Sequence, residues 1–355
     1  WTRINHKRGW LLVSGCLTAD TYIPSESGLV RLGDLPSTIV PYPIDLSLGG
    51  GSVATAVWRN LPQPTIKLRT MYGFEIEGTP DHRVMVMDGD GLADWKQFDQ
   101  LAVGDKLLLK YGHNMWGGKE FDTEDAYFAG LYLAEGCTTG ARFTITTTEP
   151  ETIDFLMRRG FIHQKGSYHY RKTDHNLLST LKSFGIDPTW KARTKEIPAG
   201  IFVASKPVVV AFLQGLFDGD GCAHVRGNVT LASASRTLLK QVQQLFLNFG
   251  IVSGLTQKVD TLKGKKFVSY NLSCGSWSKK FYDLIGFRLP RKQGRVTNLP
   301  TSHLFKTGLA PKRIIRPRIV ASVYGQRPWR TPSPRYIRGG FAPGRLLVEP
   351  DPVWK

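Results

Sequence analysis

A ten-residue segment occurs twice in the chain, and this internal repeat constrains the fold more than any other feature of the sequence. FAGLYLAEGC occupies residues 128–137 and LQGLFDGDGC occupies residues 213–222. The residues that follow the two copies also align, and both sequels alternate between helical and strand patterns. We therefore expect two similar α+β units, each of which opens with the repeated segment as a helix.

An acid followed by glycine ends each expected helix, at Glu135–Gly136 and at Asp220–Gly221. Glycine is an ordinary helix stop because it adopts the left-handed conformation without a Cβ penalty. The acid is unusual, since a carboxylate in the last turn meets the negative end of the helix dipole at a cost of about 0.3–1 kcal/mol, which a bound cation would reverse. One such segment alone would be read as a core helix with an exposed acid, but two copies in register favour a site.

Small residues four positions apart give each expected helix a flat face, Gly130 with Ala134 and Gly215 with Gly219. If these two faces pack together, both helix ends and both acids come to one place. Paired carboxylates suit hard, oxygen-preferring ions such as Mg²⁺, which activate water and stabilise a leaving phosphate oxygen. The sequence therefore predicts a site for Mg²⁺ or another divalent cation at Glu135 and Asp220.

The charge of the chain indicates a polyanionic partner. Lys and Arg number 47 against 29 Asp and Glu, which gives a formal net charge of +18, and double-stranded DNA is the leading candidate. Hydrophobic residues at 41% and charged residues at 21% are typical of a folded protein, and no apolar run approaches the ~20 residues of a membrane span, so we expect no membrane partner. Four cysteines fit neither a metal-ligand spacing nor a disulfide framework, which favours an intracellular, cytoplasmic protein.

Alternating strand segments after each repeated helix carry the residues that we expect to contact DNA. A period of two would place polar and basic side chains on one face, while Phe143, Ile145, Val229 and Leu231 face the core. Such a face can lie in a major groove, although a plain solvated sheet face is the alternative. The expected DNA-binding residues are Arg142, Thr144, Tyr168, Tyr170, Lys172, His224, Arg226 and Asn228.

The repeated segments resemble the motifs of the double-motif LAGLIDADG homing endonucleases, and the resemblance covers residues 120–300. It implies two αββαββα repeats, at about 123–205 and 206–298, in a monomer with internal pseudo-two-fold symmetry. By the same resemblance Glu135 and Asp220 are the metal-binding acids. The segments KEIPAGIF and IGFRLPRKQ are similar to those that carry the active-site lysines of the family, which fall here on Lys195 and Lys292. The alternative for either lysine is a solvated surface charge.

Short strands broken by Gly, Pro and Asp predict an all-β module for about the first hundred residues. Cys16 follows Gly15, whose unhindered carbonyl a thiolate can attack, and a nearby histidine can protonate the departing nitrogen. The segments GCLTADTYIP and GFEIEGTPDHRVMV resemble the N-terminal splicing blocks of inteins, which have the Hint fold. The resemblance implies a splicing domain over 16–115, catalytic roles for Cys16, Thr79 and His82, and an N-extein remnant at residues 1–15, with the host extein as partner in cis.

The last segment, residues 301–355, is basic and rich in proline, and we expect it to be largely disordered or truncated. The C-terminal splicing blocks are not evident, because neither His-Asn dipeptide of the chain precedes Cys, Ser or Thr. The stretch RIVASVYG (318–325) is a candidate for the start of a returning β module.

Together these patterns predict a multidomain protein in which an all-β Hint-like module carries an α+β LAGLIDADG endonuclease. The expected activity is a metal-dependent, site-specific double-strand cut in DNA, with residual N-terminal acyl-shift chemistry at Cys16. One alternative is an inactive remnant that binds DNA without cutting it. Another is a Hedgehog-type autoprocessing domain, against which the second motif copy and the charge argue.

Overall fold

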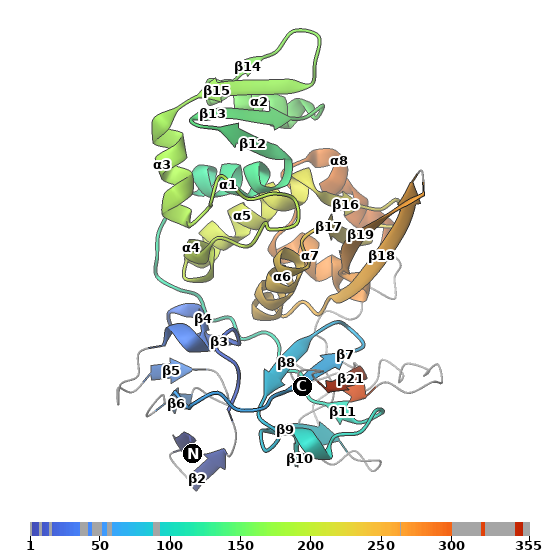
Figure 1. The fold of residues 1–355 in the computed structure, drawn as a ribbon. Coiled ribbons are helices and arrows are strands. Elements are labelled where there is room, and N and C mark those ends of the chain that lie inside the picture. Colours follow the sequence, from blue (N-terminus) through green and yellow to red (C-terminus); the bar gives the residue numbers. More distant parts are fainter. Residues whose placement is uncertain are drawn as a thin grey trace. The chain divides into compact units, whose positions relative to one another are not determined.

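The computed structural model divides into two compact units, which are described separately (Figure 1). One unit comprises Trp1–Trp116, Gln243–Leu255 and Gly308–Lys355, and the other comprises Gly117–Val242 and Thr256–Thr307. In the part of the chain that the structure describes, no helix combines the length and the apolar character that a bilayer span requires. The described residues are 2–6, 9–13, 16–35, 42–44, 52–54, 59–87, 93–262, 264–299, 321–323 and 345–350.

The repeated part of the chain forms two consecutive αββαββα arrangements within these described residues, as the resemblance to the LAGLIDADG endonucleases implies. The first consists of α1 (Thr123–Glu135), β12 (Gly136–Thr139), β13 (Arg142–Thr146), α2 (Pro150–Arg158), β14 (Ile162–His163), β15 (His169–Thr173) and α3 (His175–Phe184). The short helix α4 (Ala199–Phe202) leads to the second, which consists of α5 (Lys206–Gly219), β16 (Gly221–Ala223), β17 (Val229–Ser233), α6 (Arg236–Phe249), β18 (Gly254–Leu262), β19 (Lys265–Ser273) and α7 (Ser278–Leu284). Helix α8 (Pro290–Gln293) follows.

Each repeat folds its strands into a sheet whose described members have the orders β12-β13-β15-β14 and β16-β17-β19-β18. The alternation of side chains buries one face of each sheet: Phe143 and Ile145 on β13, and Val229 and Leu231 on β17, are fully buried. In the first repeat the ring of Phe143 packs edge-on against Tyr132 of α1. The predicted core face of both sheets is therefore confirmed.

Helices α1 and α5 lie side by side because glycines let their backbones approach closely (Figure 1). A Cβ atom added to Gly130 would lie 2.0 Å from the carbonyl oxygen of Phe212, and one added to Gly215 would lie 2.0 Å from that of Tyr127. A Cβ on Gly219 would lie 2.4 Å from the Cβ of Ala134. The predicted flat faces thus form the contact between the two repeats.

The described strands of the N-terminal region lie in two sheets, and two short 3₁₀ helices, at Leu32–Asp34 and Phe98–Gln100, accompany them. The first has the order β2-β1-β6-β5-β3-β4 and the second β10-β9-β11-β20-β21-β7-β8. Leu68, Phe98, Leu101 and Leu107 form a buried cluster in the unit that holds the second sheet. The bounds are β1 (Thr2–His6), β2 (Gly9–Val13), β3 (Tyr22–Ser25), β4 (Gly28–Arg31), β5 (Tyr42–Ile44), β6 (Ser52–Ala54), β7 (Ile66–Thr70), β8 (Glu75–Gly78), β9 (Arg83–Met87), β10 (Ala93–Gln97), β11 (Lys106–Leu107), β20 (Ala321–Val323) and β21 (Arg345–Pro350).

Two strands of this second sheet come from the segment that the composition predicts to be disordered, 301–355. Strand β21 pairs antiparallel with β7, and β20 pairs antiparallel with β11 and parallel with β21. The expectation of disorder is wrong for these strands, because they satisfy backbone groups that β7 and β11 would otherwise leave unpaired at a sheet edge. Strand β20 lies within 318–325, the stretch predicted to begin the returning β module, while the rest of 301–355 lies outside the described residues, apart from β21.

The glycine contact predicts that Gly215→Ala destabilises the protein, although alanine normally favours a helix over glycine. The added methyl group meets a carbonyl oxygen of α1 that cannot move without shifting the helix, so the free energy of unfolding should fall by about 1–3 kcal/mol or more. Denaturant titration followed by circular dichroism measures the change. Gly294→Ala is the matched control, because its Cβ would meet nothing within 4 Å and its φ of −61° suits any residue. Equal stability of the two variants would contradict the contact.

Candidate functional site

The ends of α1 and α5 bring the two predicted metal-binding acids together. Helix α1 ends at Glu135, and Asp220 caps the end of α5. A Cβ on Gly219 would lie 3.2 Å from the Cγ of Glu135, so the side chain of Glu135 reaches the end of the partner helix. Glu135 itself is exposed, whereas Asp220 is half-buried. The glycine contact thus converts two distant sequence positions into one carboxylate pair.

Electrostatics at this pair oppose the ionisation of one carboxyl. The pKa of Asp220 is raised to about 6, chiefly by burial; the charge of Glu135 contributes to the rise, while the charges of Lys195 and Lys292 lower the pKa. A carboxylate held near a second carboxylate in a partly buried place is stabilised by a bound cation. The two acids therefore fit a divalent cation, although the described residues hold no group of three or more His, Cys, Asp or Glu side chains that could enclose one. Such a cation would draw further oxygen ligands from water or from a phosphate.

The two predicted lysines bind the carbonyl ends of the same helices. The Nζ of Lys195 donates a hydrogen bond to the carbonyl oxygen of Ala134 near the end of α1, at 3.0 Å. The Nζ of Lys292 donates to three carbonyl oxygens at the end of α5, those of Phe217 at 3.0 Å, Asp218 at 2.6 Å and Gly221 at 2.7 Å. The last carbonyls of a helix have no partner within it and carry the negative end of its dipole. Each lysine therefore places a positive charge beside a motif acid.

The alternative of a solvated surface charge is wrong for Lys292, which is 6% exposed. Burial lowers the pKa of its ammonium, and the carboxylate of Asp218 opposes that shift. Lys195 is half-buried. Sequence patterns could not separate the two cases, because burial of a lysine depends on which carbonyl groups the fold leaves without partners.

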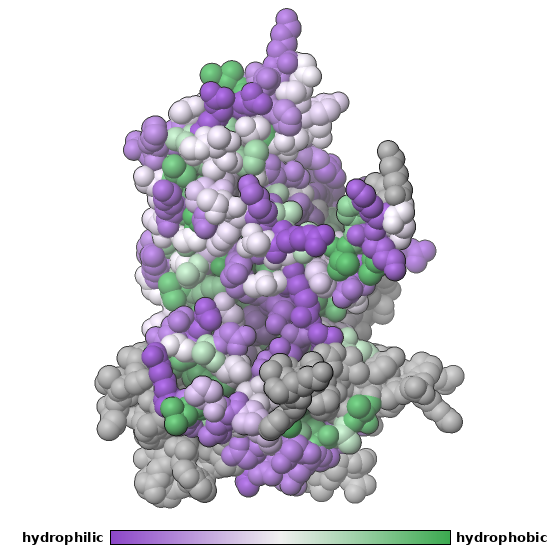
Figure 2. Space-filling model, in the orientation of Figure 1, coloured by the Kyte–Doolittle hydropathy of each residue, from purple (hydrophilic) through white to green (hydrophobic). Residues whose placement is uncertain are grey.

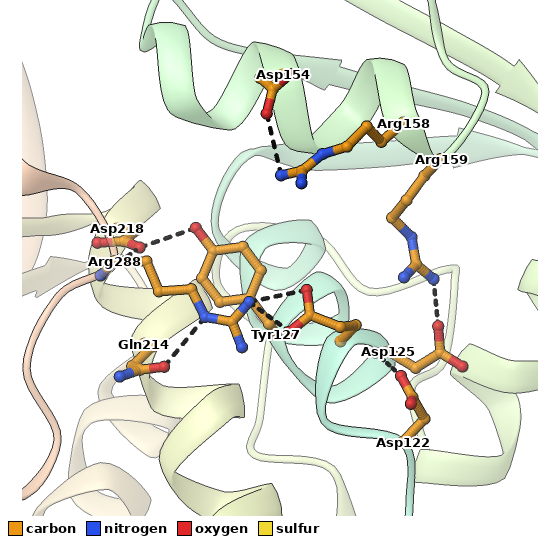
Figure 3. A network of polar contacts seen from close by, with 10 residues as sticks. Asp122, Asp125, Tyr127, Asp154, Arg158, Arg159, Gln214, Asp218 and Arg288 are labelled. Carbon is orange, nitrogen blue, oxygen red and sulfur yellow. Dashed lines mark hydrogen bonds and ion pairs between the residues drawn. The ribbon is translucent and has the colours of Figure 1, made fainter.

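Asp218, a buried acid two residues before Asp220, has a role that the sequence does not reveal. It is 3% exposed, and its Oδ2 accepts a hydrogen bond from the hydroxyl of Tyr127 at 2.8 Å (Figure 3). Burial raises its pKa, and the bond from Tyr127 opposes that shift. The sequence gives one indication that Asp218 is special: the first copy of the repeated segment has Leu133 at the equivalent position.

The predicted outward orientation of the polar side chains in the first sheet is observed for β13 but not for β15. Arg142 and Thr144 point away from the core face of Phe143 and Ile145. On β15, however, Tyr170 pairs directly with Ile145 and Lys172 with Phe143, and directly opposite residues share a face. Tyr170 is accordingly buried. Tyr168 is 67% exposed but precedes the strand.

Arg171 and His169, rather than the predicted Tyr170 and Lys172, lie on the outer face of the sheet. Arg171 pairs with Thr144 and His169 with Thr146. The segment HYRKT is polar at four of five positions, so its alternation does not show which parity faces the core, and a shift of one residue exchanges the faces. The tip of the hairpin of β14 and β15, at the top of Figure 1, is hydrophilic in Figure 2.

The predicted DNA-binding residues of the second repeat lie in a turn rather than in a strand. His224, Arg226 and Asn228 fall between β16 and β17, and the backbone N–H of His224 donates to the carbonyl of Asn228 at 2.8 Å. Gly227 has a φ of +80°, which ends the extended conformation. His224 and Arg226 are exposed at this turn, while Asn228 is half-buried and accepts a hydrogen bond from Ser278.

The predicted splicing residues also lie together, within the N-terminal β unit. The backbone N–H of Cys16 donates to the Oγ1 of Thr79 at 2.8 Å, and the N–H of Thr79 donates to the carbonyl of Cys16 at 2.9 Å. The backbone N–H of His82 donates to the carbonyl of Thr79 at 3.0 Å, so His82 belongs to the same turn. Asn60, which the sequence does not single out, donates from its side chain to the Sγ of Cys16 at 2.9 Å. Gly15 lies outside the described residues.

Comparison with known proteins identifies one family for part of the chain. Residues 207–286, from α5 to just beyond α7, match the family described as LAGLIDADG-like domain. A solved structure of I-DmoI in complex with DNA and calcium is similar at 15% identity, covering 49% of this chain and 97% of that chain, with a TM-score of 0.36.

The curated relatives are longer proteins. The chain is 26% identical over 279 residues to the alpha subunit of the ribonucleoside-diphosphate reductase NrdEB of Bacillus subtilis, covering 66% of this chain and 25% of the relative. It is 27% identical over 274 residues to a DNA gyrase subunit of Mycolicibacterium flavescens, covering 67% of this chain and 48% of the relative. The chain thus spans between a quarter and about half of the length of these two relatives.

Proposed function

We propose that this chain is an intein-type protein whose LAGLIDADG-like part is a homing endonuclease that makes a metal-dependent, site-specific double-strand break in DNA. The observation that carries the proposal is the convergence of Glu135 and Asp220 at the ends of two glycine-packed helices. Lys195 and Lys292 beside the same ends support it. The match of residues 207–286 to the LAGLIDADG-like family supports it independently.

In this proposal the residues of the chain bind a divalent cation and neutralise the negative helix ends. The cation, such as Mg²⁺, would supply Lewis-acid chemistry at the scissile phosphate. Glu135 and Asp220 hold the cation from the two repeats, so that the site spans the interface between them. The ammonium groups of Lys195 and Lys292 compensate the negative helix ends, which would otherwise repel a phosphate. Their charge also favours the ionised form of Asp220, which is the form that can bind a cation.

DNA in this proposal lies along the outer faces of the two sheets. Arg142 and Arg171 share the outer face of the first sheet, and the turn with His224 and Arg226 joins β16 to β17 in the second sheet. The net charge of +18 supports a polyanionic partner of this kind. Site-specific cutting would follow from contacts between these faces and base edges in the major groove.

The names of the relatives support the intein part of the proposal. They include proteins of a reductase, a gyrase, a replication factor C from Methanocaldococcus jannaschii and a replicative helicase from Synechocystis. The chain covers no more than 48% of any of these four. A segment that recurs within proteins of unrelated names is expected of an inserted, self-removing element rather than of any one host activity.

The proposed chemistry at Cys16 is an N-to-S acyl shift. The Cys16 thiolate attacks the carbonyl carbon of the preceding residue, the C–S bond forms, the C–N bond breaks, and the departing nitrogen takes a proton. Thr79 accepts a hydrogen bond from the N–H of that same amide and so holds it in place. His82, in the turn that Thr79 begins, is the proposed proton donor.

Asp220→Asn should abolish metal-dependent cutting while DNA binding survives. Asparagine keeps the size of the side chain but loses the charge that holds a cation, so the rate should fall by about 10²-fold or more. A plasmid with the insertion site, incubated with Mg²⁺ or with EDTA, measures nicking and linearisation, and a gel shift measures binding.

Wild-type cutting should also decline as the pH falls through about 6, because the raised pKa of Asp220 means that its protonated form prevails below that value. Equal cutting by Asp220→Asn, or by wild-type protein in EDTA, would contradict the metal site. If wild-type protein binds DNA but does not cut it with Mg²⁺, the alternative of an inactive DNA-binding remnant is favoured.

Arg171→Ala should weaken DNA binding by about tenfold or more, whereas Lys172→Ala should have little effect. The two residues are neighbours on β15 but lie on opposite faces of the sheet. The two variants therefore test whether DNA binding depends on the face that carries the charge or only on the total charge. Lys172 forms an ion pair with Asp174 at 2.7 Å, and its loss should cost about 0–1 kcal/mol of stability. Fluorescence anisotropy with labelled duplex at several salt concentrations measures both affinities. A larger loss for Lys172→Ala would place the DNA on the other face.

Dithiothreitol should release the segment before Cys16 by attacking the thioester that the acyl shift forms. Cys16→Ala should stop this release, and Thr79→Ala should slow it by about tenfold, since a buried hydrogen bond to the amide is lost. Mass spectrometry after prolonged thiol treatment detects the fragment. An intact chain after that treatment would remove the acyl-shift part of the proposal and leave the endonuclease part untouched.

A further inference from the structure

Asp218 is a buried carboxylate that the proposed chemistry does not use. It lies in the last turn of α5, two residues before the metal-binding acid Asp220, and is 3% exposed. Burial of an unpaired carboxylate is costly, so its hydrogen-bond partners indicate what it is for. Those partners come from two places, helix α1 of the first repeat and the segment that connects α7 to α8.

The carboxylate of Asp218 binds the backbone of that connecting segment. The N–H of Arg288 donates to its Oδ2 at 3.1 Å, and the N–H of Leu289 donates to its Oδ1 at 3.4 Å. The hydroxyl of Tyr127 donates to Oδ2 from the other side. A single side chain thus ties the start of the segment 288–292 to the end of α5 (Figure 3).

The far end of the same segment returns to α5 through Lys292. Its ammonium donates to the carbonyl oxygens of Phe217, Asp218 and Gly221, which surround Asp220 along the chain. An ammonium has three protons to donate, so these bonds occupy all of them. Lys292 can remain in this buried position only while its segment stays against the helix end.

The guanidinium of Arg288 also attaches the segment 288–292 to helix α1. It lies over the ring of Tyr127 at 4.0 Å and forms an ion pair with Glu124 through two bonds of 2.8 and 2.9 Å. This pair is largely exposed, and surface pairs contribute little. The side chain of Arg288 also donates a hydrogen bond to the Oε1 of Gln214 at 3.2 Å. We expect the backbone bonds to the buried Asp218 carboxylate to contribute more to the attachment than the exposed ion pair does.

We propose that Asp218 is a positioning residue that holds segment 288–292 against the end of α5 and thereby places Lys292 beside Asp220. The inference rests on the proposed function in that the placed lysine serves the cutting centre. The first repeat has no such attachment, because Leu133 stands in the place of Asp218, and Lys195 has a single carbonyl acceptor among the described residues. The second repeat thus holds its lysine more rigidly than the first.

Lysine labelling tests the proposal without requiring nuclease activity. Folded protein is treated briefly with sulfo-NHS-acetate, and mass spectrometry of the digest measures the modification of Lys292 and of Lys195 as an internal reference. In the wild-type protein Lys292 should react slowly. Asp218→Leu, which gives the second repeat the residue of the first, should raise the labelling rate of Lys292 by about tenfold or more, because the buried bonds to the segment are lost. The rate for Lys195 should not change.

Two further variants keep the test decisive. Asp218→Asn retains one acceptor oxygen and should give an intermediate rate, and it serves as the main test if Asp218→Leu fails to show a cooperative melting transition. Arg288→Ala removes the ion pair with Glu124, the contact with the Tyr127 ring and the hydrogen bond to Gln214. It keeps the backbone N–H that Asp218 binds, so labelling of Lys292 should stay near the wild-type rate. Unchanged labelling of Lys292 in folded Asp218→Leu and Asp218→Asn would overturn the proposal, as would a rate in Arg288→Ala equal to that in Asp218→Leu.

Cutting assays on the same proteins separate this inference from the proposed function. If the wild-type protein cuts DNA, Asp218→Asn should lower the maximal rate at saturating Mg²⁺ while DNA affinity in EDTA stays unchanged. If the wild-type protein does not cut, the endonuclease proposal fails, but the labelling result still decides whether Asp218 positions Lys292.

Discussion

The close approach of α1 and α5 is the constraint on which the site depends. Gly130 and Gly215 each face a carbonyl oxygen of the partner helix at a distance that excludes any side chain. The contact extends to the helix ends, where Gly219 faces Ala134 and Glu135, so the acids at the C-terminal ends become neighbours. The small residues are therefore a condition for the site, because larger ones would move the two carboxylates apart.

The closeness of the helix ends concentrates negative charge, which the two lysines partly neutralise. Two sets of orphan carbonyls and two carboxylates meet in a partly buried place, and each of these groups favours a positive charge nearby. Lys195 supplies that charge from the segment before α4, and Lys292 supplies it from α8. Burial nevertheless keeps the pKa of Asp220 raised, and the proposed cation would favour its ionised form.

The two repeats share a topology but differ in how they attach their lysines. In the second repeat Asp218, Tyr127 and the backbone of Arg288 and Leu289 form a buried network around the end of α5. In the first repeat the corresponding helix position is the buried apolar residue Leu133. Pseudo-symmetry therefore describes the backbone of the site, while the side chains that support the two halves are different.

The sequence by itself determined the duplication, the acids at the helix ends, the flat helix faces and the core faces of β13 and β17. Each of these follows from local periodicity or from the spacing of small residues, which a single sequence displays. It could not determine the parity of β15, where polar residues occupy both faces and only the pairing with β13 places Arg171 outward and Tyr170 inward. It pointed to a strand near β20 but could not show which strands β20 and β21 join, because partners distant along the chain supply their hydrogen bonds. The burial of Lys292 and the role of Asp218 were likewise decided by tertiary structure, since both depend on which backbone groups the fold leaves in need of a partner.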